Sequence, residues 1–176
     1  MKAEYLNPFL KSVVQIVEST AGETPQRGKV FLRGKYPFES ADVAIIVGIT
    51  GVLTGQVILS MSIDAAKGIA ARMLMEDEVP ELDEYAQSAL AEMANMITAN
   101  ATIGLADAGF NCDITPPSVI TGSRIEISCQ EGIQTLVIPL ELTMGKLDVN
   151  LSMIETAMFA GVKKKVRGDA AVEQKA

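Results

Sequence analysis

The chain has 176 residues, a length typical of one domain with enough chain to bury a hydrophobic core. Hydrophobic residues make up 48% of the sequence and aromatic residues only 5%, so the core is expected to be aliphatic. The chain contains no histidine, which excludes Ser-His and Cys-His nucleophile pairs, imidazole metal sites and a phosphorylated histidine.

The net charge of −7 is unevenly distributed. Residues 163–176 contain five basic and two acidic residues, which leaves −10 for residues 1–162. An acidic body argues against nucleic-acid binding, and it suits either docking on a basic partner surface or solubility alone. No apolar run resembles a signal core or reaches membrane-spanning length, and Cys112 and Cys129 form no Cys-x-x-Cys pair. We expect a cytoplasmic protein without membrane contact, with both thiols buried and inert.

Hydrophobic periodicity and turn residues predict helices and strands along the chain. In order, they are a helix over 4–21, strands over 28–34, 43–49 and 56–62, a helix over 65–75 capped by Asp64, a helix over 83–106, and strands over 118–121, 124–130, 134–143 and 147–153. The β-branched run over 43–49 indicates a strand buried on both faces. The pair Pro116–Pro117 cannot belong to a central strand.

A short internal repeat indicates how these elements are organised. The sequence Val57-Ile-Leu-Ser-Met61 recurs 92 residues later as Val149-Asn-Leu-Ser-Met153. We therefore predict an α+β fold of two pseudo-symmetric helix-plus-three-strand units, which form one mostly antiparallel sheet with the helices packed on one face. The predicted domain covers residues 1–160, and residues 161–176 read as a basic, disordered tail.

The helix over 83–106 carries the chain's most informative chemistry. Its expected core face contains the apolar residues Tyr85, Ala89, Met93, Met96, Ile97 and Ile103. At 100° per residue, Ser88, Glu92 and Asn95 fall within about 60° of one another on a different face.

Small residues beside this polar stripe, including Ala91 and Ala99, would let a partner surface approach the helix closely. A carboxylate and a carboxamide one turn apart can dock on a cation and hold a water molecule. The same pair on an outer helix face is also compatible with ordinary solvation, so the pattern needs its context.

That context is the spacing Ser88-x3-Glu92-x2-Asn95, followed about twenty residues later by Pro116–Pro117. This pattern resembles the signature of the CheC/CheX/FliY phosphatases of bacterial chemotaxis, and it is most similar to CheX. The opening Tyr5-Leu-Asn-Pro-Phe-Leu is also similar to the first helix of CheX-like domains. The resemblance covers residues 1–160, and we expect one active site per chain, on the helix over 83–106.

The resemblance implies a hydrolase that removes the aspartyl phosphate of a CheY-type response regulator. It implies that Asn95 orients the attacking water and that Glu92 pairs with the regulator's lysine. Ser88 would orient Glu92 or contact the partner, with Ala91 and Ala99 beside it. No cofactor or metal of its own is implied, because the regulator would supply Mg²⁺.

Two other functions remain open from the sequence. One is a non-catalytic CheX-like module that binds a regulator or acts as a flagellar-switch adaptor, and the other is a purely structural homo-oligomeric domain. CheX-like proteins commonly dimerise through their sheets, so the resemblance also implies a homodimer. Strands such as 134–142, if they lie at a sheet edge, would supply the contact.

Overall fold

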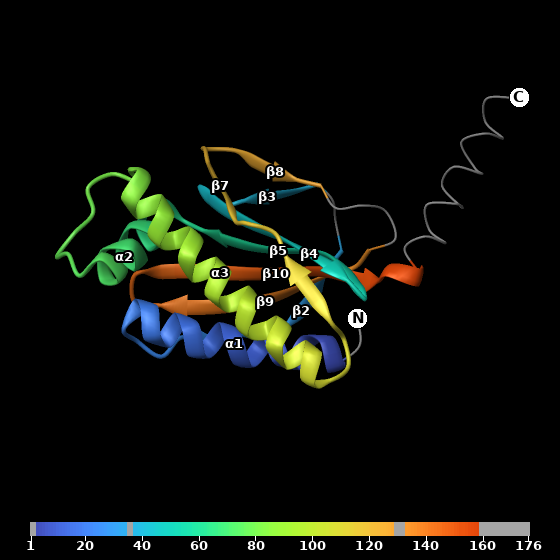
Figure 1. The fold of residues 1–176 in the computed structure, drawn as a ribbon. Helices are drawn as coiled ribbons and strands as arrows, with labels where there is room; N and C mark the ends of the chain where they lie inside the picture. The colour runs from blue at the N-terminus through green and yellow to red at the C-terminus, as the bar shows by residue number, and fades with distance from the viewer. Residues whose placement is uncertain (1–2, 35–36, 129–132, 159–176) are drawn as a thin grey trace, which may run out of the picture.

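A computed structural model describes residues 3–34, 37–128 and 133–158. In these ranges the helices α1 (Ala3–Ala21), α2 (Ile63–Leu74) and α3 (Glu84–Asp107) cover one face of a large antiparallel sheet (Figure 1). The strands are β1 (Gln26–Arg27), β2 (Phe31–Arg33), β3 (Phe38–Ser40), β4 (Val43–Gly51), β5 (Leu53–Met61), β6 (Cys112–Ile114), β7 (Ser118–Thr121), β8 (Ile125–Ile127), β9 (Thr135–Leu142) and β10 (Gly145–Glu155).

The large sheet has the order β1-β9-β10-β5-β4-β6, with β2 also paired to β9 and β7 also paired to β4. The short strands β3 and β8 form a separate pair that packs on the other side of the sheet, where Ala44 and Ile58 contact Phe38 and Ile127. The strand over 43–49 is thus covered on both faces, as the β-branched run predicted. The predicted α+β fold, with helices on one face of a mostly antiparallel sheet, is confirmed.

The internal repeat lies at the centre of the sheet. Strands β5 and β10 are antiparallel neighbours, and Ile58 stands opposite Asn150, 92 residues away in the chain. The edge strands are exchanged between the two halves: β1 and β2 pair with β9, whereas β6 and β7 pair with β4. Each half therefore has a helix, an edge formed by two short strands, one strand of the small sheet and a hairpin of two long strands. The predicted unit of one helix and three strands thus had too few strands.

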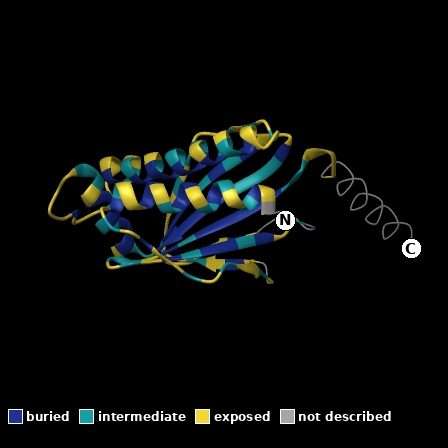
Figure 2. Cartoon of the chain, turned by 90° about the horizontal axis from the view of Figure 1, so that it is seen from below, coloured by how far each residue is buried: buried dark blue, intermediate teal, exposed yellow. Residues whose placement is uncertain are grey.

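Hydrophobic packing between the helices and the sheet forms the main core, and the outer helix faces are exposed (Figure 2). The buried face of α3 consists of Ala86, Leu90, Met93, Ala94, Ile97, Thr98, Ala101 and Leu105. The predicted core face is correct at Met93 and Ile97 but wrong at Tyr85 and Ile103, which are 77% and 62% exposed. Small alanine side chains on the buried face let the helix lie close to its neighbours. Tyr85 and Ile103 therefore lie on the outer side of the helix.

Several local predictions are corrected by the structure. Ser62, not Asp64, caps α2, because its hydroxyl accepts a hydrogen bond from the Ala65 amide at 3.3 Å. The residues of β9 do not form a sheet edge, since β1 and β2 cover them. Cys112 is half-buried rather than fully buried, and Cys129 lies outside the described residues, as does the whole predicted tail over 161–176.

Candidate active site

Helix α3 presents the predicted polar stripe on its outer side. Asp83 fixes the start of the helix, because its carboxylate accepts a hydrogen bond from the Ala86 amide at 2.9 Å. From that start, Ser88 and Glu92 are exposed and Asn95 is half-buried. Among the described residues, no hydrogen bond or ion pair engages the side chain of Glu92 or Asn95. Both groups are therefore available to a partner.

A groove of about 410 Å³ runs along this stripe. It is lined by Ser88, Ala91, Glu92, Asn95, Ile114, Thr115, Pro116 and Pro117. The helix forms one wall, and the connection between β6 and β7 forms the other. The structure thus brings the proline pair next to the Glu92–Asn95 pair, although about twenty residues separate them in the chain. A groove this open admits a surface of another macromolecule.

The second wall is fixed by contacts with β4. The Thr115 hydroxyl accepts a hydrogen bond from the Gly48 amide at 2.9 Å, and the Thr115 amide donates to the Gly48 carbonyl at 3.0 Å. Position 48 has no room for a side chain, because an added Cβ would lie 2.9 Å from Thr115 Cγ2. The next two residues, Pro116 and Pro117, each have their own backbone dihedral φ fixed by the proline ring. The wall is consequently a rigid one.

The predicted binding residues do not all share the groove. Ala91 lines it and is half-buried, whereas Ala99 lies about two turns further along α3 and is not among its lining residues. No hydrogen bond joins Ser88 to Glu92 in the described part of the chain, so contact with a partner suits Ser88 better than orienting Glu92. Sequence reasoning missed Ile114 and Thr115, which have no chemical signature apart from their place before the prolines.

Helix α1 carries a glutamate and an asparagine at the same spacing, at Glu4 and Asn7. The expectation of one site per chain took no account of this pair. Its surroundings differ from those of the pair on α3, because the connection between β1 and β2, which corresponds to the proline-bearing wall, contains Gly28, Lys29 and Val30 and no proline. The complete arrangement of stripe and rigid wall is found on α3.

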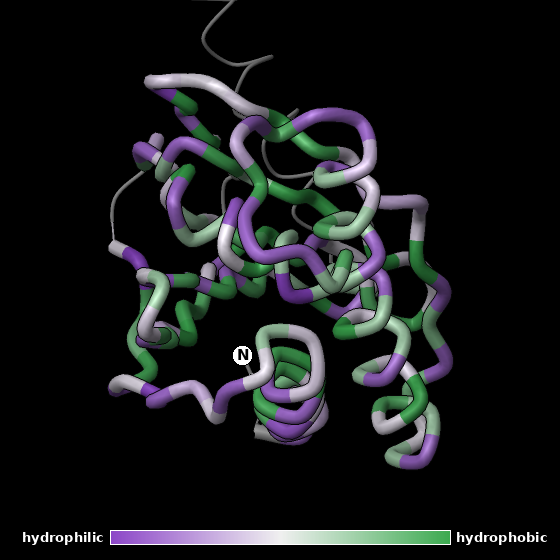
Figure 3. Tube along the Cα trace, turned by 90° about the vertical axis from the view of Figure 1, so that its left-hand side faces the viewer, coloured by the Kyte–Doolittle hydropathy of each residue, from purple (hydrophilic) through white to green (hydrophobic). Residues whose placement is uncertain are grey.

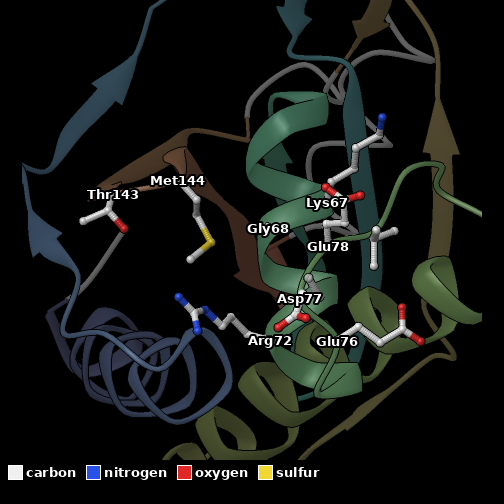
Figure 4. A pocket seen from close by; sticks show the side chains of 10 residues that line it. Lys67, Gly68, Arg72, Glu76, Asp77, Glu78, Thr143 and Met144 are labelled. Carbon is white, nitrogen blue, oxygen red and sulfur yellow. The ribbon is translucent and has the colours of Figure 1, made fainter.

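A second cavity, of about 550 Å³, lies beside α2 and the loop that follows it (Figure 4). Its charged lining mixes two cations, Lys67 and Arg72, with three acids of the loop over 76–78. Figure 4 shows Arg72 extending toward the side of Thr143 and Met144, whereas Lys67 points away from it. No carboxamide lines this cavity, so it does not offer the chemistry of the α3 groove.

The charged residues of α3 and of the loop before it are all acidic. Helix α3 contains no lysine or arginine, and the loop over 76–83 that precedes it is mainly hydrophilic (Figure 3). None of the helices in the described ranges is long and apolar enough to cross a membrane. Within those ranges, no three His, Cys, Asp or Glu side chains gather as a metal site would require. The lining of the α3 groove thus includes one carboxylate, Glu92, and one carboxamide, Asn95.

Comparison with protein families gives a match to "Chemotaxis phosphatase CheX" over residues 43–141. The chain is 32% identical over 127 residues to the CheY-P phosphatase CheX of Thermotoga maritima, a match that covers 72% of this chain and 81% of that protein.

Two solved structures show the same arrangement of elements. A chemotaxis protein CheX from Desulfovibrio desulfuricans is 25% identical, with a TM-score of 0.78 and coverage of 86% of this chain and 99% of that one. The CheX chain of a CheX–CheY–BeF₃–Mg²⁺ complex from Borrelia burgdorferi is 30% identical, with a TM-score of 0.74 and coverage of 86% and 98%.

Proposed function

Because the chain belongs to the CheX family of chemotaxis phosphatases, we propose that it hydrolyses the aspartyl phosphate of a CheY-type response regulator, with Glu92 and Asn95 as its active residues. The observation that carries the assignment of residues is the free, outward-facing carboxamide of Asn95, one turn from an exposed carboxylate in an open groove.

The reaction asks little covalent chemistry of the phosphatase. Water attacks phosphorus and the bond between phosphorus and the aspartyl oxygen breaks. The regulator regains its aspartate carboxylate, and inorganic phosphate leaves with the oxygen of the water. Phosphoryl transfer of this kind passes through a loose transition state, so placing the water and neutralising charge supply most of the acceleration. A protein without histidine is therefore equipped for the task.

Asn95 suits the placement of water because an amide both donates and accepts hydrogen bonds and carries no charge. It would hold the water in line with the breaking bond without repelling the phosphoryl oxygens. Glu92 would pair with a lysine of the regulator and so fix the register of the two proteins. Ser88, Ala91 and Ala99 would contact the regulator around this pair.

The cation belongs to the partner in this proposal. The complex from Borrelia burgdorferi contains CheY, BeF₃ and Mg²⁺ together with CheX. We propose that the regulator likewise supplies Mg²⁺ to the site formed with this chain, and that both proteins meet in the cytoplasm. We further propose that residues 1–160 form the catalytic domain, with residues 161–176 as an appended basic tail.

The test is phosphate release from phosphorylated regulators of the same genome. The wild-type chain is expected to accelerate release from at least one of them, and Glu92→Ala is expected to raise KM about tenfold or more, because one charged contact is lost. A regulator-binding module without activity would bind phosphorylated and unphosphorylated regulator alike and release no phosphate. That outcome would contradict the proposal.

A further inference from the structure

The outer face of α3 carries two large apolar side chains in addition to the Glu92–Asn95 pair. Tyr85 is 77% exposed and Ile103 is 62% exposed. At 100° per residue, both lie within about 80° of the polar stripe, one on each side of it along the helix. At 1.5 Å per residue, they are about 27 Å apart.

The fold itself does not account for these two residues. The main core draws on the opposite face of α3, through residues such as Leu90 and Leu105, and neither Tyr85 nor Ile103 packs against it. A single exposed apolar residue is ordinary on a protein surface. Two of them, in line on one rigid helix with the polar stripe between them, offer a partner an aromatic and an aliphatic contact in addition to the polar ones. Large side chains such as tyrosine often contribute most of the binding energy of an interface.

The surroundings of Tyr85 strengthen this inference. A hollow of about 480 Å³ lies beside it and is lined by Leu74, Glu76, Val79, Pro80, Glu81, Asp83 and Tyr85. Its lining combines the apolar residues Leu74, Val79 and Pro80 with the acids Glu76, Glu81 and Asp83. It therefore suits a partner segment in which an apolar side chain lies next to a basic one.

We propose that Tyr85 and Ile103 are docking residues that hold the receiver domain of the phosphorylated regulator at both ends of α3. This proposal rests on the proposed function. Helix α3 supplies acids and apolar side chains but no lysine or arginine. The surface of the regulator that fits it should therefore carry a basic group between two apolar patches. The two anchors would set affinity and choice of regulator, and they would leave the chemical step to Asn95.

The experiment separates docking from chemistry. Tyr85→Ala and Ile103→Ala are each expected to raise KM for the phosphorylated regulator about tenfold or more, which is the usual effect of removing an interface anchor, with kcat unchanged within a factor of two. Tyr85→Phe should keep the wild-type KM, because the ring provides the contact. Ile120→Ala is the matched control, since Ile120 is 41% exposed on β7 and stands opposite Ala44, which packs on the sheet face away from the helices.

Direct binding keeps this test independent of turnover. The Kd of a beryllofluoride-activated regulator of the same genome should rise about tenfold for Tyr85→Ala and for Ile103→Ala, and it should remain unchanged for Asn95→Ala and Ile120→Ala. If wild type binds the regulator but releases no phosphate, the proposed function fails while the docking residues stand. If the alanine variants bind as tightly as wild type, or if no regulator binds, the docking proposal is overturned.

Discussion

At the scale of single residues, the site depends on an uncharged group at position 95. An aspartate there would bring a second negative charge next to Glu92 and would repel the phosphoryl oxygens. The amide has nearly the same shape without that charge, and no other described side chain competes for its hydrogen bonds. Local packing thus leaves Asn95 free for a function outside the chain.

A second residue, on the other face of the sheet, links stability to pH. Burial raises the pKa of the Asp148 carboxyl above its usual 3.8, and the nearby Arg33 guanidinium only partly offsets this. Between pH 3.8 and the raised pKa, the folded state therefore binds more protons than the unfolded state. The free energy of unfolding falls as pH rises through this interval.

Asp148→Asn should therefore be more stable than wild type at pH 7, and its advantage should disappear at pH values below 3.8. Chemical denaturation of both proteins across this range measures the difference. An Asp148→Asn variant that is less stable than wild type at pH 7 would show that the attraction to Arg33 outweighs the cost of burial.

At the scale of elements, α3 shows what the sequence could predict. The 100° spacing placed Ser88, Glu92 and Asn95 on one outer stripe, and the structure agrees. The buried face was only partly predicted, because alanine carries a weak hydrophobic signal although it permits close packing. Tyr85 and Ile103 attract attention as hydrophobic residues, yet they face solvent.

The wall opposite α3 depends on a glycine in β4. Gly48→Ala would place a Cβ 2.9 Å from Thr115 Cγ2, so the wall must shift and strain the hydrogen bond at the Gly48 amide. We expect a loss of about 1–3 kcal/mol in the free energy of unfolding, and slower phosphate release. Urea denaturation measures the first effect.

Thr115→Ser in the Gly48→Ala background is the matched control. It removes Cγ2 and keeps the hydroxyl, so it should recover part of the lost stability, although the hydroxyl oxygen still lies 3.0 Å from the added Cβ. Equal stability of Gly48→Ala and wild type would show that the wall adapts without cost.

At the scale of the whole molecule, the short repeat in the sequence predicted two related halves. It could not predict that the edge strands of each half pair with the other half. The sequence predicted strands over 28–34 and 118–121, where β2 and β7 lie, but β1 and β6, with two and three residues, are too short for an alternating pattern to be recognised. Their partners lie in the other half of the chain. The groove is created by this exchange, because the connection of β6 to β7 must cross to β4 to face α3.

The homodimer stays a prediction at this scale, but the expected contact changes. β9 was the expected edge, but β2 pairs with it and places it inside the sheet. The apolar edge is instead offered by β2, on which Phe31 and Leu32 are exposed. Light scattering after size exclusion is expected to give twice the mass of one chain at micromolar concentration. The mass of a single chain would contradict it.

Catalysis by a positioned amide is tested most directly by phosphate release with Asn95→Ala under saturating phosphorylated regulator. We predict a fall in kcat of about a hundredfold or more, with unchanged Kd for the regulator and an unchanged free energy of unfolding. If Asn95→Ala binds normally and releases phosphate at the wild-type rate, the water is positioned by some other group and the assignment of Asn95 is wrong.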